Sequence, residues 1–293
     1  MKFMPTSASA RLRPIRIKTL FVVLAFLLLA AVTAPYMLAS QIKKATALDS
    51  ATTLQIVLAS SHRSEYNRAR DQYRHPLQTL DFFGLRPNMT VVELWPGKGW
   101  YTEILAPFLA QKGQLIVTNF DPEKSKPAQS FQEKLAANPE VFGSVKVVQI
   151  TPPNDLTLAP DNSVDMVLTF RNIHNWVAAG YADRVYAAAY QALKPGGILG
   201  VEEHRGQPGI PLQESAKTGY MSESGVIAAL ESAGFKLVDK SEINANPQDT
   251  KDYPGDVWAL PPTLSQGEKD RQRYLAIGES DRMTLKFVKP KVP

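Results

Sequence analysis

Polar side chains that can do acid–base chemistry follow directly on one apolar run of the sequence. Arg171, Asn172 and His174 come immediately after residues 164–170, a run with the composition of a buried strand. A histidine can take a proton near neutral pH, and arginine and asparagine can orient a substrate by hydrogen bonds. A polar cluster that abuts an apolar strand therefore predicts substrate contact. We take these three residues as candidate catalytic residues, with His174 foremost.

Two other roles stay open for this cluster. Glu202, Glu203 and His204 end the next apolar run, so Arg171 can pair with one of these glutamates while His174 caps a loop. The same histidines and carboxylates also allow a metal site. Carboxylates and histidines at a sheet edge are more often hydrogen-bonded or ion-paired than metallated, so no metal is expected.

A glycine loop forms the second candidate site. Gly97 and Gly99 follow the β-rich run 90–94 and precede a helical stretch at 100–109. Glycine lets the backbone approach a ligand closely, and the N-terminus of a helix can receive a carboxylate through its free N–H groups. The segment therefore predicts a strand, a ligand-binding loop and a helix.

The elements that must position these residues alternate between the strand and the helix period. A helical extension is expected at 49–85, broken at His75-Pro76, and a helix at 181–193 is followed by a turn at 194–197. Strands are expected at 90–94, 115–118, 145–150, 164–170, 198–201, 235–238 and 283–288. This alternation predicts a doubly wound α/β domain with a parallel sheet, which binds ligands at the carboxyl ends of its strands.

Three motifs in this order resemble those of class I S-adenosylmethionine-dependent methyltransferases. They are residues 92–94 with Gly97 and Gly99, the segment 161–165, and the segment 193–197. The resemblance implies a Rossmann-like fold with a mostly parallel sheet, an antiparallel C-terminal strand and a helical N-terminal extension. It also implies S-adenosylmethionine as cofactor and methyl transfer to an unknown small molecule or envelope component.

A narrower resemblance extends over nearly the whole domain. Residues 93–103, 171–176 and 203–205 look like a subfamily of predicted exported methyltransferases, and the similarity runs from about residue 70 to 290. A nicotinamide-binding loop fits less well, because Thr102 stands where its third glycine belongs. An exported, catalytically silent protein that binds a ligand in the same cleft is the alternative function.

The resemblance assigns cofactor contacts residue by residue. Gly97 and Gly99 receive the carboxylate of the cofactor, and Glu93 faces its ammonium group. Asn119 or Asp121, at the end of the second strand, accepts hydrogen bonds from the ribose. Asp155, in the loop after the third strand, is placed for the adenine.

Three positions depart from the family pattern. Trp95 stands where the family has its first glycine, so its indole is either a wall of the cofactor pocket or fills it. Asn119 occupies a position where an acid is expected. Pro107 is expected to interrupt the helix that follows the loop.

The charge of the chain is concentrated at its N-terminus. The 293 residues carry a formal charge of +5, yet Lys2, Arg11, Arg13, Arg16 and Lys18 precede the first apolar run, and no acidic residue occurs before Asp49. The remainder is close to neutral, which makes nucleic-acid binding an unexpected function. The chain has no cysteine, which excludes disulfides, thiolate metal sites and cysteine nucleophiles.

The basic stretch and the uncharged run 20–32 predict a signal peptide or an N-terminal membrane anchor at residues 1–40. The methyltransferase-like domain then occupies 41–293, with its core at about 70–290. The positive-inside rule places the domain outside the cytoplasm, in the periplasm or facing outward from the inner membrane. The membrane is expected to contact the protein only through this segment, and the partner is a small-molecule substrate.

Overall fold

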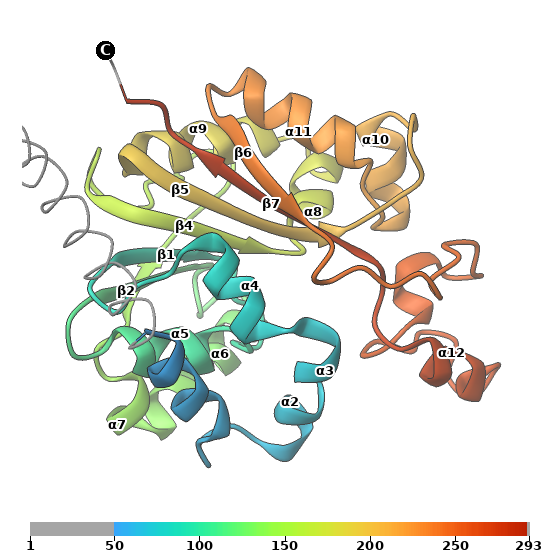
Figure 1. Ribbon diagram of the computed structural model, residues 1–293, viewed down its shortest axis with the longest axis horizontal. Coiled ribbons are helices and arrows are strands. Elements are labelled where there is room, and N and C mark those ends of the chain that lie inside the picture. The colour runs from blue at the N-terminus through green and yellow to red at the C-terminus, as the bar shows by residue number, and fades with distance from the viewer. Residues whose placement is uncertain (1–49, 292–293) are drawn as a thin grey trace, which may run out of the picture. The chain divides into compact units, whose positions relative to one another are not determined.

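The computed structural model describes residues 50–291, which fold around one seven-stranded sheet (Figure 1). The predicted signal or anchor at residues 1–40 lies outside the described residues. None of the helices within 50–291 has the length and apolar character needed to cross a bilayer.

The sheet has the strand order β3-β2-β1-β4-β5-β7-β6. Its first five strands are parallel, and β7 runs antiparallel to both β5 and β6. The strands are β1 Thr90–Leu94, β2 Gln114–Asn119, β3 Lys146–Gln149, β4 Val164–Phe170, β5 Leu193–His204, β6 Lys236–Ser241 and β7 Arg282–Val288. The expected mostly parallel sheet with an antiparallel C-terminal strand is confirmed. The direction of connection reverses between β1 and β4, which is where open α/β sheets bind their ligands.

Helices cover both faces of this sheet (Figure 1). Before β1 come a helix at residues 50–59 and then α2 Glu65–Ala69, α3 Asp71–Arg74 and α4 Pro76–Phe83. Between β1 and β5 lie α5 Thr102–Leu109, α6 Lys126–Ala137, α7 Pro139–Phe142, α8 Ile173–Ala178 and α9 Ala182–Ala192. After β5 follow α10 Leu212–Ser215, η1 Ala216–Thr218, α11 Glu223–Ser232, η2 Asp256–Ala259 and α12 Arg271–Ile277.

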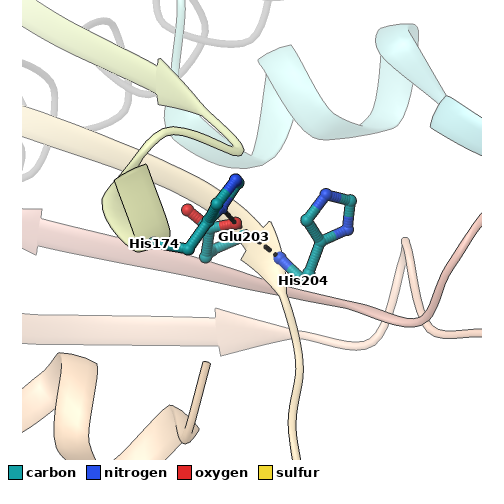
Figure 2. A group of neighbouring side chains, drawn as sticks. All are labelled: His174, Glu203 and His204. Carbon is teal, nitrogen blue, oxygen red and sulfur yellow. Dashed lines mark hydrogen bonds and ion pairs between the residues drawn. The ribbon is translucent and has the colours of Figure 1, made fainter. Parts of the chain in front are cut away.

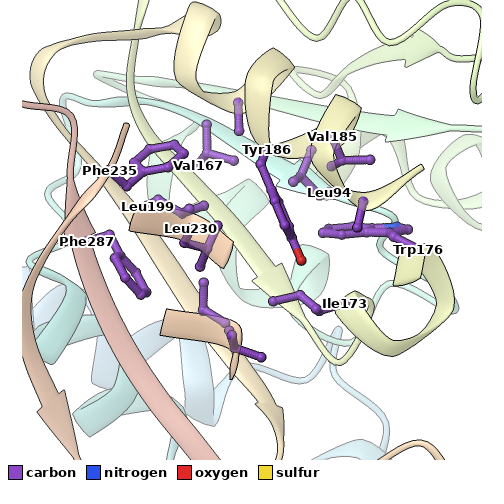
Figure 3. Packing of buried hydrophobic residues seen from close by; sticks show 14 of the residues in the cluster. Leu94, Val167, Ile173, Trp176, Val185, Tyr186, Leu199, Leu230, Phe235 and Phe287 are labelled. Carbon is purple, nitrogen blue, oxygen red and sulfur yellow. The ribbon is translucent and has the colours of Figure 1, made fainter. Parts of the chain in front are cut away.

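Each face of the sheet has its own apolar core. On one face α8, α9 and α11 pack on the sheet, and Figure 3 shows Trp176 and Tyr186 among the aliphatic side chains of this core. On the other face α4 and α5 pack with Leu80, Phe83 and Ile104, all fully buried. Burial on both faces explains why β1 and β4 are almost continuous apolar runs in the sequence.

The structure corrects two local expectations. The segment 194–197 was expected to turn the chain before the fifth strand, but it lies within β5. The register between β4 and β5 shifts there, from Val164 opposite Leu193 to Met166 opposite Ile198, so the extra residues form an irregularity inside the strand. Gly196, with φ of 85°, permits that shape.

The second correction concerns Pro107, which lies inside α5 without ending it. A proline cannot donate the backbone hydrogen bond that the carbonyl of Glu103 would accept in a regular helix. The His62 ring nitrogen lies 2.8 Å from that carbonyl oxygen and takes the place of the missing donor. The helical extension thus compensates for the proline.

Candidate active site

A cavity of about 320 Å³ lies at the carboxyl edge of the sheet, over the ends of β1, β4 and β5. It is lined by the helical extension, the loops that follow β1 and β4, the end of β5, and the C-terminal insert with residues 257–263 and 279–280. This is the position at which the fold predicts a ligand site. Segments from both ends of the domain sequence therefore close around the same space.

The three predicted catalytic residues all line this cavity. Asn172 donates from Nδ2 to the carbonyl oxygens of Leu94 and Trp95 at 3.0 and 3.3 Å, so it ties the loop after β4 to the loop after β1. Arg171 has a positive φ of 59°, an uncommon conformation for a residue with a side chain. Its structural context holds it there, since its backbone N–H donates to the carbonyl of Glu202 at 2.7 Å.

His174 is held by a buried carboxylate (Figure 2). His174 Nδ1 lies 3.0 Å from Glu203 Oε1, and because a carboxylate oxygen only accepts, Nδ1 carries the proton. Glu203 is fixed in turn, as its oxygens also accept from the backbone N–H groups of Ile173 and His204. The other ring nitrogen of His174, Nε2, has no hydrogen-bond partner among residues 50–291. In its neutral form, His174 therefore presents an acceptor at the cavity wall.

His204 lies beside this pair and also lines the cavity. The His204 and His174 rings are 5.6 Å apart, and His204 Nδ1 is 2.6 Å from Ser280 Oγ. Burial, together with the nearby His174 and Arg171, lowers the pKa of His204 well below its usual value. His204 is therefore neutral at physiological pH.

Ligand atoms of His174, Glu203 and His204 lie within 4.8 Å of one another, a spacing that a metal ion can use. Both oxygens of Glu203 already accept hydrogen bonds, however, and the cavity is rich in arginine. A cation there would lose those hydrogen bonds and meet positive charge. We therefore describe the group as a hydrogen-bonded pair next to a neutral histidine, and the absence of a metal stays a prediction.

Four arginines surround one buried carboxylate, Glu279, which also lines the cavity. Glu279 is contacted by Arg70 Nε at 2.6 Å, Arg74 Nε at 3.0 Å, Arg282 Nη1 at 3.3 Å and Arg171 Nη1 at 3.6 Å. Burial alone raises the pKa of Glu279, but the guanidinium groups outweigh it and hold the pKa at about 2. Burial, and then the positive charge of Arg171, lowers the pKa of Arg74 to about 9.

Of this cluster the sequence indicated only Arg171, and Glu279, Arg70, Arg74 and Arg282 were not predicted as site residues. Arg74 is only 2% exposed and lies 4.6 Å over the Trp100 ring. Glu279 is far from the motifs in sequence and precedes β7 at the end of a long insert. The one available signal was the pair of arginines spaced four residues apart on the helical extension.

Gly97 and Gly99, in the loop after β1, are required by the structure for different reasons. Gly97 has a φ of 58°, a Cβ added to it would meet no atom within 4 Å, and it lines the cavity. Gly99 has a φ of 75°, and its added Cβ would come within 2.8 Å of the Phe131 ring of α6. The close approach that requires Gly99 is therefore to a core side chain, while Gly97 is open to a ligand.

Trp95 lines the cavity, and its indole also fills the space next to the cavity, between Phe120 and Trp176. Its backbone has a φ of 45°, and its indole lies 4.9 Å from Trp176 and 6.1 Å from Phe120. The ring thus packs between the end of β2 and α8. Its Nε1 is buried without a hydrogen-bond partner.

The predicted nucleoside contacts do not line the cavity. Asn119 Oδ1 accepts from the backbone of Phe120, and Asp121 accepts from Glu123 N and pairs with Lys124. Asp155 is exposed and lies on a separate hollow of about 430 Å³ beside α9. Their roles stay predictions, and any ribose or adenine contact would have to be made on the far side of Trp95.

Glu93 is also outside the cavity. Its side chain is fully buried and accepts a 2.7 Å hydrogen bond from Thr102 Oγ1. Burial raises its pKa to about 7, against the opposing effects of Thr102 and Lys134. Contact between Glu93 and the cofactor ammonium stays a prediction.

These observations test how S-adenosylmethionine fits. The amino-acid end fits, because Gly97 offers an open cradle at the cavity wall and Lys98 lies next to it. The nucleoside end fits only beside the indole of Trp95, which occupies the space between Phe120 and Trp176.

Comparison with known proteins agrees with this architecture. Residues 92–201 match a family model described as a methyltransferase domain. No curated protein sequence matches the chain.

Several solved structures are similar to it. The [4+2]-cyclase SpnF is 17% identical, with 80% of this chain and 86% of that chain covered and a TM-score of 0.56. A chain of the complex that contains the Haloferax volcanii Trm112 methyltransferase activator is 16% identical, with 78% and 94% covered and a TM-score of 0.50. An S-adenosylmethionine-dependent methyltransferase from Aquifex aeolicus is 22% identical, with 60% and 87% covered and a TM-score of 0.49. Residues 92–201 are therefore similar to a methyltransferase domain, and the chain has the mostly parallel, Rossmann-like α/β fold of methyltransferases.

Proposed function

We propose that the protein is an S-adenosylmethionine-dependent methyltransferase whose acceptor binds in the 320 Å³ cavity, with His174 as its general base. The observation that carries the proposal is the 3.0 Å hydrogen bond between His174 Nδ1 and the buried Glu203 carboxylate, beside the loop of Gly97. It fixes the tautomer in which Nε2 accepts a proton.

The cofactor supplies an electrophilic methyl group on a sulfonium sulfur. Gly97 and Lys98 would hold its amino-acid end, because this stretch lines the cavity and is open to a close approach. Asn172 fixes the spacing between this loop and the start of α8, which carries His174, through its bonds to Leu94 and Trp95. Such positioning is the main demand that methyl transfer makes on a protein.

His174 would take the proton of an attacking hydroxyl or amine at Nε2. The negative Glu203 then stabilises the imidazolium that forms and keeps the ring in place. General-base catalysis of this kind contributes about 10²- to 10⁴-fold in rate. The neutral His204 beside it adds no competing positive charge.

One observation favours a second function, that of a catalytically silent ligand-binding protein. The indole of Trp95 packs between Phe120 and Trp176, where the nucleoside is expected. If it remains there in every state, the cavity binds a ligand without a methyl donor.

Binding of S-adenosylhomocysteine to the full-length chain tests the proposal by calorimetry. Gly97→Ala places a side chain in the cradle at a positive φ, and we expect it to weaken binding about tenfold or more. Gly180→Ala is the matched control, since Gly180 has a φ of 74°, is also open around its Cβ, and lies away from the cavity. Both variants should lose about 1 kcal/mol of stability from backbone strain.

The proposal requires that only Gly97→Ala weakens binding. Equal affinities for Gly97→Ala and the unmodified chain, or no binding at millimolar ligand, would reject the loop as the cofactor site and favour the silent binder.

We also propose that the domain works outside the cytoplasm, from the charge pattern of residues 1–40. Protease added to intact spheroplasts should digest the domain. Protection that is lost only after lysis would contradict this location.

A further inference from the structure

We propose that the arginine side of the cavity is an oxyanion site, which holds a carboxylate or phosphate group carried by the methyl acceptor. The identity of the bound molecule as an acceptor rests on the proposed function. The anion site itself rests on the contacts around Glu279.

The wall of the cavity carries more positive than negative charge. Four basic side chains line the cavity, Arg70, Arg74, Lys98 and Arg171, and Glu279 is the one acidic side chain that lines it among the described residues. Lys98 is exposed, but the three arginines are largely buried, and buried charges of one sign raise the energy of the folded state unless opposite charge reaches them. A ligand that brings negative charge into this cavity therefore removes a destabilising excess.

The arginines at the cavity have hydrogen-bond donors that no protein group uses. Arg70 and Arg74 both spend Nε on Glu279, which leaves Arg70 Nη2 and Arg74 Nη1 buried with no partner. Within residues 50–291, five buried side-chain polar atoms lack a partner, and three belong to residues that line this cavity: Arg70, Arg74 and Trp95. Buried polar atoms normally have partners, so this concentration indicates a ligand.

Protein contacts hold the guanidinium groups in place without a ligand. Arg74 lies 4.6 Å over the Trp100 ring, and Trp100 Nε1 donates to the Asn67 carbonyl at 3.0 Å. Arg171 is held at a positive φ, a strained conformation of the kind that clusters at ligand sites. Guanidinium groups held in this way present planar donors that match the oxygens of a carboxylate or phosphate.

The arginines and His174 line the same cavity, so the anion site can orient the acceptor toward His174. Arg70, Arg74 and His174 line the same cavity, and the rings of His174 and His204 are next to each other at the end of β5. An acceptor anchored by its anionic group at Arg70 and Arg74 therefore keeps its other end near Nε2 of His174. The proposal predicts an acceptor with an oxyanion at one end and a hydroxyl or amine at the other.

Titration of the full-length chain with inorganic phosphate at low ionic strength tests the site. We expect saturable binding that Arg70→Gln weakens about tenfold or more, since it removes a charged donor. Arg70 is 15% exposed, so its replacement is tolerated more easily than that of Arg74, and Arg74→Lys serves as the second variant. Arg68→Gln is the matched control, with the same loss of charge on α2 but no place in the cavity.

A second titration, with S-adenosylhomocysteine at saturation, separates the acceptor from the cofactor. Phosphate binding that persists in its presence and depends on Arg70 supports the proposal. Phosphate binding that the cofactor product abolishes assigns the arginines to the cofactor carboxylate and overturns it. Absent binding, or equal weakening by Arg70→Gln and Arg68→Gln, also overturns it. A chain that binds phosphate through Arg70 but not S-adenosylhomocysteine would reject the proposed function while leaving the anion site intact.

Discussion

The carboxyl edge of the sheet has two halves, one held by aromatic packing and the other by ion pairs and hydrogen bonds. Beyond the ends of β2 and β1, Trp95, Phe120 and Trp176 pack against one another. Over the ends of β4 and β5, the cavity is bordered by His174 and by the arginines around Glu279, with buried donors left unpartnered. The aromatic half is closed mainly by ring contacts and leaves one buried indole donor, Trp95 Nε1, without a partner, whereas the charged half leaves two buried guanidinium nitrogens without partners beside Glu279.

The two halves of this edge therefore differ in role, the aromatic half in stability and the charged half in binding. Aromatic packing stabilises the folded state by itself and needs no ligand. A buried arginine nitrogen without a partner lowers stability by about 1–3 kcal/mol, and such a loss is typical of a binding site. The charged half is therefore the part of the edge where we place the reaction.

The largest effect is expected for the catalytic pair. His174→Gln keeps a side-chain donor for Glu203 but removes the basic nitrogen, and should lower the turnover of an oxyanion-bearing acceptor by about 10²- to 10⁴-fold. The formation of S-adenosylhomocysteine measures this, with cofactor affinity and melting temperature unchanged. Asn175→Gln, an exposed neighbour on α8, is the control. A fall in stability with full specific activity would make His174 a structural residue.

The next effect is on stability and concerns the centre of the charged half. Glu279→Gln leaves four guanidinium groups without their shared carboxylate, and we expect it to lower the free energy of unfolding by about 3–5 kcal/mol. Urea unfolding at pH 7 measures it. Glu268→Gln removes an exposed carboxylate of the same insert and should change stability by less than about 0.5 kcal/mol.

The same carboxylate predicts a pH dependence. Because the pKa of Glu279 falls from 4.5 to about 2 on folding, its contribution is complete above pH 4.5 and is lost as the pH falls toward 2. Stability of the unmodified chain should decline over that interval more steeply than stability of Glu279→Gln. Parallel declines would show that Glu279 does not hold the arginines together.

A smaller effect of opposite sign is expected beneath the glycine loop. The pKa of Glu93 rises from 4.5 to about 7 on folding, so ionisation of Glu93 destabilises the fold as the pH rises through this interval. Glu93→Gln keeps a hydrogen-bond partner for Thr102 but cannot ionise. The free energy of unfolding of the variant minus that of the unmodified chain should therefore be about 3 kcal/mol larger at pH 8 than at pH 4.5. Urea unfolding at both pH values measures it. An unchanged difference would mean that Glu93 is ionised in the fold.

The smallest effect concerns the aromatic half. Trp95→Gly removes the indole at a position whose φ of 45° suits glycine, and should raise the affinity for S-adenosylhomocysteine about tenfold by opening the nucleoside side. Calorimetry measures it, with Trp258→Ala at another wall of the cavity as the control. A weaker complex would instead make the indole a contact of the cofactor.

The positions of the strands along the chain and the place of the ligand-binding edge were predictable from the sequence. Short apolar runs such as 164–170 indicate buried strands. The residues that follow parallel strands lie at the same edge of the sheet. The sequence placed His174 at this edge for that reason, and it does line the cavity there. Its partner Glu203 was one of two neighbouring glutamates, and only the register of β5 decides which one faces the histidine.

The charged half was harder to predict because it is assembled from distant segments. Arg74 precedes the first strand in the sequence, whereas Glu279 lies in the long insert between the last two strands. The direction of the Trp95 side chain likewise depends on packing against Trp176 and Phe120, which no local pattern encodes. Periodicity places strands, but tertiary contacts decide which polar atoms remain unsatisfied.

A crystal structure of the full-length chain with S-adenosylhomocysteine and phosphate tests the division of the edge most directly. Our account predicts phosphate against Arg70 Nη2 and Arg74 Nη1, with the amino-acid end of the cofactor product at Gly97 and His174 Nε2 facing the space between them. Phosphate elsewhere, with the arginines still unpartnered, would contradict the account.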